Sequence, residues 1–168
     1  FDRLVEKVNW SGLRKEIDSF NAAHRLLKRG AAVIPICFGI SFTNLQMNRG
    51  GALVHVYQDG SVLVSTGAVE MGQQVSRKIA RVVSRSFGIP ISKIRVERTT
   101  TLTVANTVPT AASTGSDING MAALIACGEI KKRLMAAAAG ILGVPQAELD
   151  IEDGRVMRNH EPTPLTWD

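Results

Sequence analysis

Cysteine and histidine are scarce in this sequence, and neither type is spaced as metal ligands are. Cys37 and Cys127 are far apart and each lies among apolar residues, while the three histidines are scattered. This spacing excludes a disulfide framework and a Cys-x-x-Cys metal pair. We therefore expect two buried free thiols, no metal held by side chains of this chain, and a reducing, cytoplasmic setting.

Long uncharged apolar runs are also missing. The most apolar stretch, residues 121–143, is interrupted by Glu129, Lys131, Lys132 and Arg133, so it is too charged to span a bilayer. The first residues carry no charged-then-apolar signal pattern. The net charge of +5 comes from basic residues spread along predicted helices. We expect neither a membrane nor a nucleic-acid partner.

The bulk composition is that of a globular protein. The chain has 168 residues, of which 45% are hydrophobic and 21% charged, enough for one domain with a core. Because the chain begins on Phe1 and ends without a terminating pattern, we expect a fragment of a longer protein. We expect a leading helix at 1–30, an α+β core at 31–158 and a tail at 159–168.

Periodicity and turn residues predict the elements. We expect a helix over 10–29 capped by Ser11, followed by a strand over 31–43. The Gln58-Asp59-Gly60 turn joins strands at 52–57 and 61–65. The remaining elements are a helix from near Gly72, a strand at 94–96, a loop at 99–113 and a long helix to about Leu142.

One pattern occurs twice along the chain. Gly88 and Pro90 end a helix before the strand at Ile94, and Gly143 and Pro145 do the same before Leu149. A final hairpin then turns at 153–154. These repeated helix–Gly-x-Pro–strand units predict an α+β fold, with a mixed sheet and helices packed on one side of it.

Two turns in the sequence could hold a ligand. At 67–74 a strand leads through Gly67 and Gly72 into a helix start, where unpaired N–H groups and the helix dipole favour an anion. Gln73 adds an amide that can both donate and accept. The alternative is a plain strand-to-helix turn, with Glu70 placed to favour the helix dipole.

The second turn is a run of small residues at 109–117 that opens the long helix. Small side chains let a ligand approach the backbone, and Ser113, Thr114 and Ser116 add hydroxyls. The alternative is a helix cap formed by Ser113 or Ser116. Neither turn is a Walker loop or a G-x-G-x-x-G turn, so together they indicate one extended anionic cofactor.

Motifs over roughly residues 11–135 resemble the molybdenum hydroxylase family of xanthine dehydrogenases and aldehyde oxidases. They are Leu27-Lys28-Arg29-Gly30, Phe38-Gly39-Ile40-Ser41-Phe42-Thr43, Gly51-Ala52-Leu53-Val54-His55, Glu70-Met71-Gly72-Gln73, Ile89-Pro90-Ile91-Ser92-Lys93-Ile94 and Pro109-Thr110-Ala111-Ala112-Ser113. In this chain Gln74 stands where many members have glycine.

The resemblance implies roles for residues in both turns and before the first strand pair. The expected cofactor contacts are Gly72, Gln73, Ala111, Ala112, Ser113, Thr114, Gly115 and Ser116. Phe42 and Thr43 match positions that face a flat heterocyclic substrate. The implied cofactor is molybdenum bound to molybdopterin.

The implied activity is oxidation of a purine-like heterocycle or an aldehyde, with water as the oxygen source. The resemblance places the base in a Gly-Glu motif that has no match here, so we expect no catalytic residue in this fragment. Other domains or subunits of the parent enzyme would carry 2Fe-2S clusters and possibly FAD. The alternative is a non-catalytic domain that binds a pterin or serves as a scaffold for other subunits.

Overall fold

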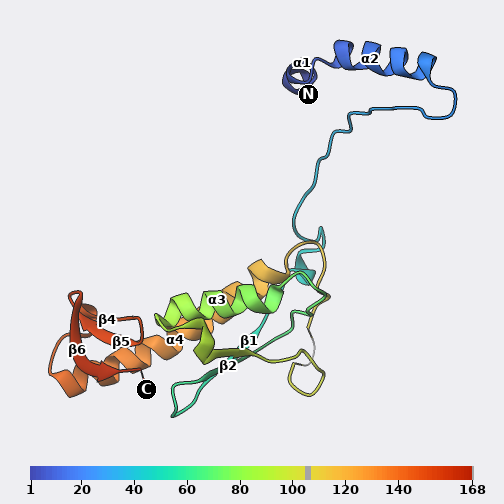
Figure 1. Cartoon of the computed structure of the whole chain (residues 1–168). Helices are drawn as coiled ribbons and strands as arrows, with labels where there is room; N and C mark the ends of the chain where they lie inside the picture. Colours follow the sequence, from blue (N-terminus) through green and yellow to red (C-terminus); the bar gives the residue numbers. More distant parts are fainter. Residues whose placement is uncertain (105–106, 168) are drawn as a thin grey trace. The chain divides into compact units, whose positions relative to one another are not determined.

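The computed structural model describes residues 1–104 and 107–167, and its contacts divide the chain into two units, residues 1–39 and 40–168 (Figure 1). The division therefore falls after Gly39 and not after residue 30, where we expected it. Residues 105–106 of the expected loop and residue 168 of the expected tail lie outside the described residues. No helix in the described part is both long and apolar enough to cross a bilayer.

The first unit contains two helices, α1 (Asp2–Lys7) and α2 (Trp10–Ala23). Asn9 adopts a left-handed conformation between them, and its side chain accepts a hydrogen bond from the N–H of Gly12 at 3.3 Å. Asparagine tolerates this conformation and is a favoured N-cap. The cap is therefore Asn9 and not Ser11 as predicted.

Helix α2 ends well before the predicted position, residue 29. The side chain of Asn21 accepts a hydrogen bond from the Arg29 N–H at 2.7 Å and donates one to the Arg29 carbonyl at 2.9 Å. Arg29 therefore lies back alongside α2, with its guanidinium 3.8 Å from the ring centroid of Phe20. A helix that continued to residue 29 could not make these contacts.

The predicted strand at 31–43 and the predicted burial of Cys37 are both wrong. The segment forms no strand, and Cys37 and the side chains of Ile34, Ile36 and Phe38 are exposed. The sequence has the apolar content of a strand. A strand also requires a hydrogen-bonded neighbour, which this segment does not have among the described residues.

The second unit begins with a mixed sheet, as predicted. Strand β1 (Ala52–Val56) pairs antiparallel with β2 (Val62–Thr66), and β2 pairs parallel with β3 (Ile94–Val96). The turn between β1 and β2 is tightened by Asp59, whose carboxylate accepts hydrogen bonds from the backbone and hydroxyl of Ser61.

Helices α3 (Val75–Phe87) and α4 (Gly115–Leu142) pack against each other and both contact this sheet (Figure 1). The helices cover the face that carries Val54 and Val64, both buried, and the opposite face exposes Leu53 and His55. One-sided packing is therefore confirmed.

The repeated units are also confirmed, down to their backbone angles. Gly88 ends α3 with φ 67° and ψ 34°, and Gly143 ends α4 with φ 65° and ψ 35°. Both are left-handed C-caps, a conformation that favours glycine. After each comes a proline and a short 3-10 helix, η2 (Ile91–Lys93) or η3 (Gln146–Glu148), and then a strand.

The second repeat builds a separate antiparallel sheet of β4 (Leu149–Glu152), β5 (Arg155–Arg158) and β6 (Glu161–Thr166). The α+β class is thus confirmed, but the described strands form two sheets where one was expected, and the expected tail contains a strand. The pairs 153–154 and 159–160 both have positive φ, so two tight turns fold the chain back on itself.

Candidate functional site

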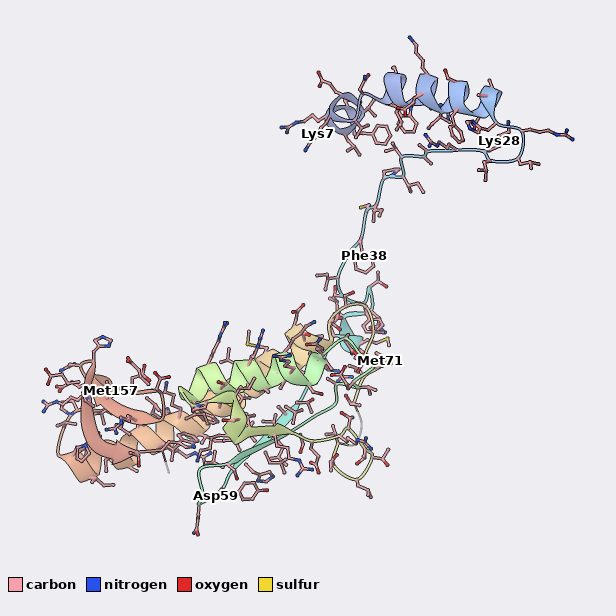
Figure 2. All side chains as sticks on the ribbon, in the orientation of Figure 1. Lys7, Lys28, Phe38, Asp59, Met71 and Met157 are labelled. Carbon is pink, nitrogen blue, oxygen red and sulfur yellow. The ribbon has the colours of Figure 1, made fainter. Side chains whose placement is uncertain are left out.

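The two turns singled out in the sequence line one pocket of about 370 Å³ in the second unit. The wall is formed by Met71, Gln73, Val75, Lys78, Thr110, Ala111, Ser113, Gly115 and Ser116. Figure 2 marks Met71 close to the N-terminal end of α3. Of the predicted cofactor contacts, Gly72, Ala112 and Thr114 belong to the same turns but do not line the pocket.

Direct contacts hold the two turns together. The hydroxyl of Thr110 accepts a hydrogen bond from the Val69 N–H at 2.9 Å. Gly67 lies so close to Thr107 that an added Cβ would overlap its hydroxyl oxygen and lie 2.6 Å from its Cβ. The turn at 67–74 thus needs a glycine because another chain segment packs on it, which sequence spacing could not reveal.

The start of α3 already holds an anion of its own. The Glu70 carboxylate accepts hydrogen bonds from the N–H groups of Gly72, Gln74 and Ser76 at 3.0, 2.9 and 3.1 Å. The Ser76 N–H, together with those of Gln74 and Gly72, lowers the pKa of the Glu70 carboxyl below its usual 4.5. Glu70 therefore occupies the α3 start, as the alternative interpretation of this turn predicted, while Gln73 of the same turn lines the pocket.

Gln73 uses its side-chain amide within the same turn. Its Oε1 accepts a hydrogen bond from the Met71 N–H at 2.6 Å, and its Nε2 donates one to the Val69 carbonyl at 2.9 Å. The next residue, Gln74, is the N-cap of α3 and has φ 61°. Glycine adopts this conformation without strain, whereas Gln74 must be held in it by its neighbours.

The start of α4 is different because no side chain caps it. The N-cap is Thr114, and neither Ser113 nor Ser116 bonds to the first turn, so the predicted serine cap is wrong. The Thr114 hydroxyl instead donates to the Ala111 carbonyl at 3.0 Å. Within the described residues, the N–H groups of 115–117 have no partner. This end of α4 can therefore still bind an anion.

The two residues before Thr114 have an unusual backbone conformation at the point where the chain forms part of the pocket wall. Ala112 and Ser113 are consecutive residues with positive φ, at 52° and 58°. Two left-handed residues in a row are uncommon for side chains other than glycine. Such strain is typical of segments held in place for binding.

Among the described residues of the pocket wall only Lys78 is charged, and the sequence pattern did not single it out. It lies one turn into α3, on an exposed surface. The sequence signal for Lys78 was its position four residues after Gln74, in the first helical turn that follows the glycine-containing segment 67–74. Its charge suits an anionic ligand.

The predicted substrate residues Phe42 and Thr43 do not line this pocket. They precede the short helix η1 (Leu45–Met47), and Asn48 holds Phe42 through two hydrogen bonds of 2.9 Å. The Ser41 N–H donates to the Ala112 carbonyl at 3.0 Å. The segment with Phe42 is therefore attached to the second ligand turn, with Phe42 half-buried and Thr43 exposed.

Nearly the whole chain matches one protein family. Residues 3–168 match the family model described as molybdopterin cofactor-binding domain. Xanthine dehydrogenase/oxidase of Gallus gallus is 52% identical over 134 residues, and xanthine dehydrogenase of Emericella nidulans is 46% identical over 134 residues. Each match covers 80% of this chain and 10% of the relative, so the chain spans about a tenth of these proteins.

Solved structures of related enzymes share the fold. CO dehydrogenase from Oligotropha carboxidovorans matches with a TM-score of 0.64 and 25% identity, over 71% of this chain and 15% of that one. Quinoline 2-oxidoreductase from Pseudomonas putida 86 matches with a TM-score of 0.58 and 26% identity, over 66% and 14%. With a family model that covers residues 3–168, the chain belongs to the molybdopterin cofactor-binding domain family.

Proposed function

We propose that the pocket between the α3 and α4 starts forms part of the molybdopterin site of a molybdenum-dependent hydroxylase. One observation carries the proposal. Gln73 and the small residues Ala111, Ser113, Gly115 and Ser116, about 40 positions apart in the chain, line the same pocket. The family model and the xanthine dehydrogenase relatives support the identity of the ligand.

The donors around the pocket fit a cofactor that carries a phosphate. The uncapped N–H groups at 115–117 and the hydroxyls of Ser113 and Ser116 are hydrogen-bond donors at the positive end of α4. Lys78 adds a full positive charge from the opposite helix. We propose that the phosphate lies between Lys78 and the α4 start, and that Gly72, Gln73, Ala112 and Thr114 shape the turns around the pterin.

The substrate would approach from the segment that contains Phe42 and Thr43. This segment is attached to the cofactor turn through the hydrogen bond from Ser41 to Ala112. The Phe42 ring would pack against a flat heterocycle and the Thr43 hydroxyl would bond to it. We propose this role for both residues, with purine-like heterocycles and aldehydes as the substrate classes.

The whole enzyme would oxidise its substrate with water as the oxygen source. The molybdenum centre supplies the two-electron oxidation when the cofactor is bound. The residues described here bind and orient the pterin, whereas the catalytic base and the 2Fe-2S and possible FAD centres would lie in other parts of the parent enzyme. We propose a cytoplasmic location, in keeping with the free thiols.

A non-catalytic scaffold is the second candidate, and one observation favours it. Helix α4 exposes the apolar side chains of Met121, Leu124, Ile125 and Ile141, and contiguous exposed apolar surface is typical of interaction sites. Packing against other parts of the parent enzyme would cover these side chains. Such packing is compatible with cofactor binding, so only the absence of the cofactor would favour a scaffold alone.

The experiment is molybdenum and pterin analysis of the full polypeptide that carries this chain. We expect about one molybdenum and one pterin per polypeptide, and loss of roughly 90% of the pterin in Lys78→Gln, because a charge-assisted bond to phosphate contributes about 1.5–3 kcal/mol. Arg77→Gln is the matched control, since Arg77 is an exposed neighbour outside the pocket wall. Folded polypeptide without pterin, from cells that make other active molybdenum enzymes, would leave only the scaffold.

A further inference from the structure

The segment at 69–76 separates two cavities. Met71 and Gln73 line the pocket of about 370 Å³ described above. Glu70 and Ser76 line a second cavity of about 620 Å³, together with Glu97, Arg98 and neighbouring residues. Neighbouring residues of this one segment therefore line both cavities.

Glu70 is the residue that connects this segment to α3. Its Oε1 accepts from Gly72 and Gln74 and its Oε2 accepts from Ser76, so both carboxylate oxygens are used. Gln74 and Ser76 lie at the helix start, where N–H groups have no intrahelical partner, and Gly72 lies in the turn before it. Hydrogen bonds to an ionised acceptor are roughly twice as strong as neutral ones.

We propose that Glu70 is a positioning residue for the cofactor. Its carboxylate occupies the anion position at the α3 start and holds the turn that presents Met71 and Gln73 to the pocket. The phosphate of the cofactor is then left with Lys78 and the uncapped start of α4 as its partners. This inference rests on the proposed cofactor site and adds to it a residue outside the pocket wall.

The positioning role of Glu70 should weaken at low pH, because its ionised carboxylate accepts the three hydrogen bonds. Glu70 is held below its usual pKa by the three N–H groups, so the ionised, bonded form prevails at neutral pH. The hydrogen bonds of Glu70 contribute fully to the stability of the turn above the pKa that Glu70 has in the unfolded chain. This contribution is lost as the pH falls through the pKa that Glu70 has in the folded chain. The charged groups that share its cavity are Glu97, whose carboxylate accepts from the Ser65 hydroxyl at 2.7 Å, and Arg98.

The first test follows backbone amides of this chain by NMR between pH 7 and pH 3. We expect the amide signals of Gly72, Gln74 and Ser76 to shift together, with one midpoint below 4.5, and this shift to vanish in Glu70→Gln. Glu97→Gln is the matched control, because Glu97 lines the same cavity but accepts none of these three bonds. Three amides that titrate separately, or that still shift in Glu70→Gln, would overturn the proposal.

The second test measures pterin content and pterin release from the full polypeptide. We expect Glu70→Ala to retain about a tenth of the wild-type pterin, because it loses bonds to a charged group, and Glu70→Gln to recover most of it. Release should accelerate in the wild type as the pH falls through the Glu70 midpoint and stay flat in Glu70→Gln. Circular dichroism identifies any variant that does not fold.

The outcomes separate the two proposals. Wild-type pterin content and release in Glu70→Ala would refute the positioning role and leave the cofactor site intact. A wild-type polypeptide without pterin would refute both, even if the three amides titrate with Glu70. Pterin lost in Glu70→Ala, recovered in Glu70→Gln and released with the predicted pH dependence would support the role beyond a simple helix cap.

Discussion

The helix C-caps Gly88 and Gly143 form a matched pair of sites. Comparing them measures how much tertiary packing adds to the cost of placing a side chain in a left-handed conformation. Gly88 and Gly143 have nearly the same φ and ψ. Only Gly88 is crowded: an added Cβ there would overlap the Ile151 carbonyl oxygen and lie 2.7 Å from its carbon, whereas nothing lies within 4 Å at Gly143. The substitutions Gly88→Ala and Gly143→Ala therefore share the backbone cost and differ in the steric cost.

The magnitudes follow from these two costs. An alanine in the left-handed region lowers the free energy of unfolding by about 1–2 kcal/mol, and we expect this loss for Gly143→Ala. Overpacking against neighbours adds about 1–3 kcal/mol, so Gly88→Ala should lose about 3–4 kcal/mol in total. The Gly88 carbonyl also accepts a 2.8 Å hydrogen bond from the Gly154 N–H, so the crowded backbone cannot move away freely.

The assay is urea unfolding of both variants and the wild type at one temperature, followed by circular dichroism. We expect Gly88→Ala to be about 2 kcal/mol less stable than Gly143→Ala, with similar m-values in both. Equal losses, within about 0.5 kcal/mol, would show that α3 and β4 are not in close contact near Gly88. The reasoning from the Cβ overlap would then be refuted.

Two further predictions concern the pocket and the thiols. Gly67→Ala should displace Thr107 and the turn at 109–117, and so reduce the pterin content of the full polypeptide. Gly128→Ala, in open space on α4, should leave the pterin content unchanged. Equal pterin content in the two variants would contradict the contact between Gly67 and Thr107. Burial raises the pKa of the Cys127 thiol to about 11. At pH 8 iodoacetamide should therefore modify exposed Cys37 and spare Cys127 until the chain unfolds, which mass spectrometry of the peptides can check. Early modification of Cys127 would contradict its burial.

Local patterns predicted most of the second unit. The Gln58-Asp59-Gly60 turn, the apolar stripe of α3 and the Gly-x-Pro stops depend on residues within a few positions of one another, so the sequence displays them directly. The two ligand turns were found in the same way, from small residues and glycines before helix starts.

Elements that depend on distant partners could not be predicted in this way. The segment at 31–43 has strand composition but forms no strand, since pairing depends on another segment. The last ten residues carry a weak pattern, yet β6 forms because β5 lies beside it. Cys37 looked buried because its neighbours are apolar, although none of them packs over it.

By itself, the sequence determined the α+β class and the repeated helix–glycine–proline–strand units, and it singled out the two turns as candidate ligand sites, because each follows from short-range conformational preference. Only the tertiary structure decided how those turns are used. It placed them around one pocket, filled the α3 start with Glu70, left the α4 start uncapped and brought Lys78 into the wall. The reason is physical: a helix start can be satisfied by its own side chain or by a ligand, and only the folded positions of the competing groups determine which.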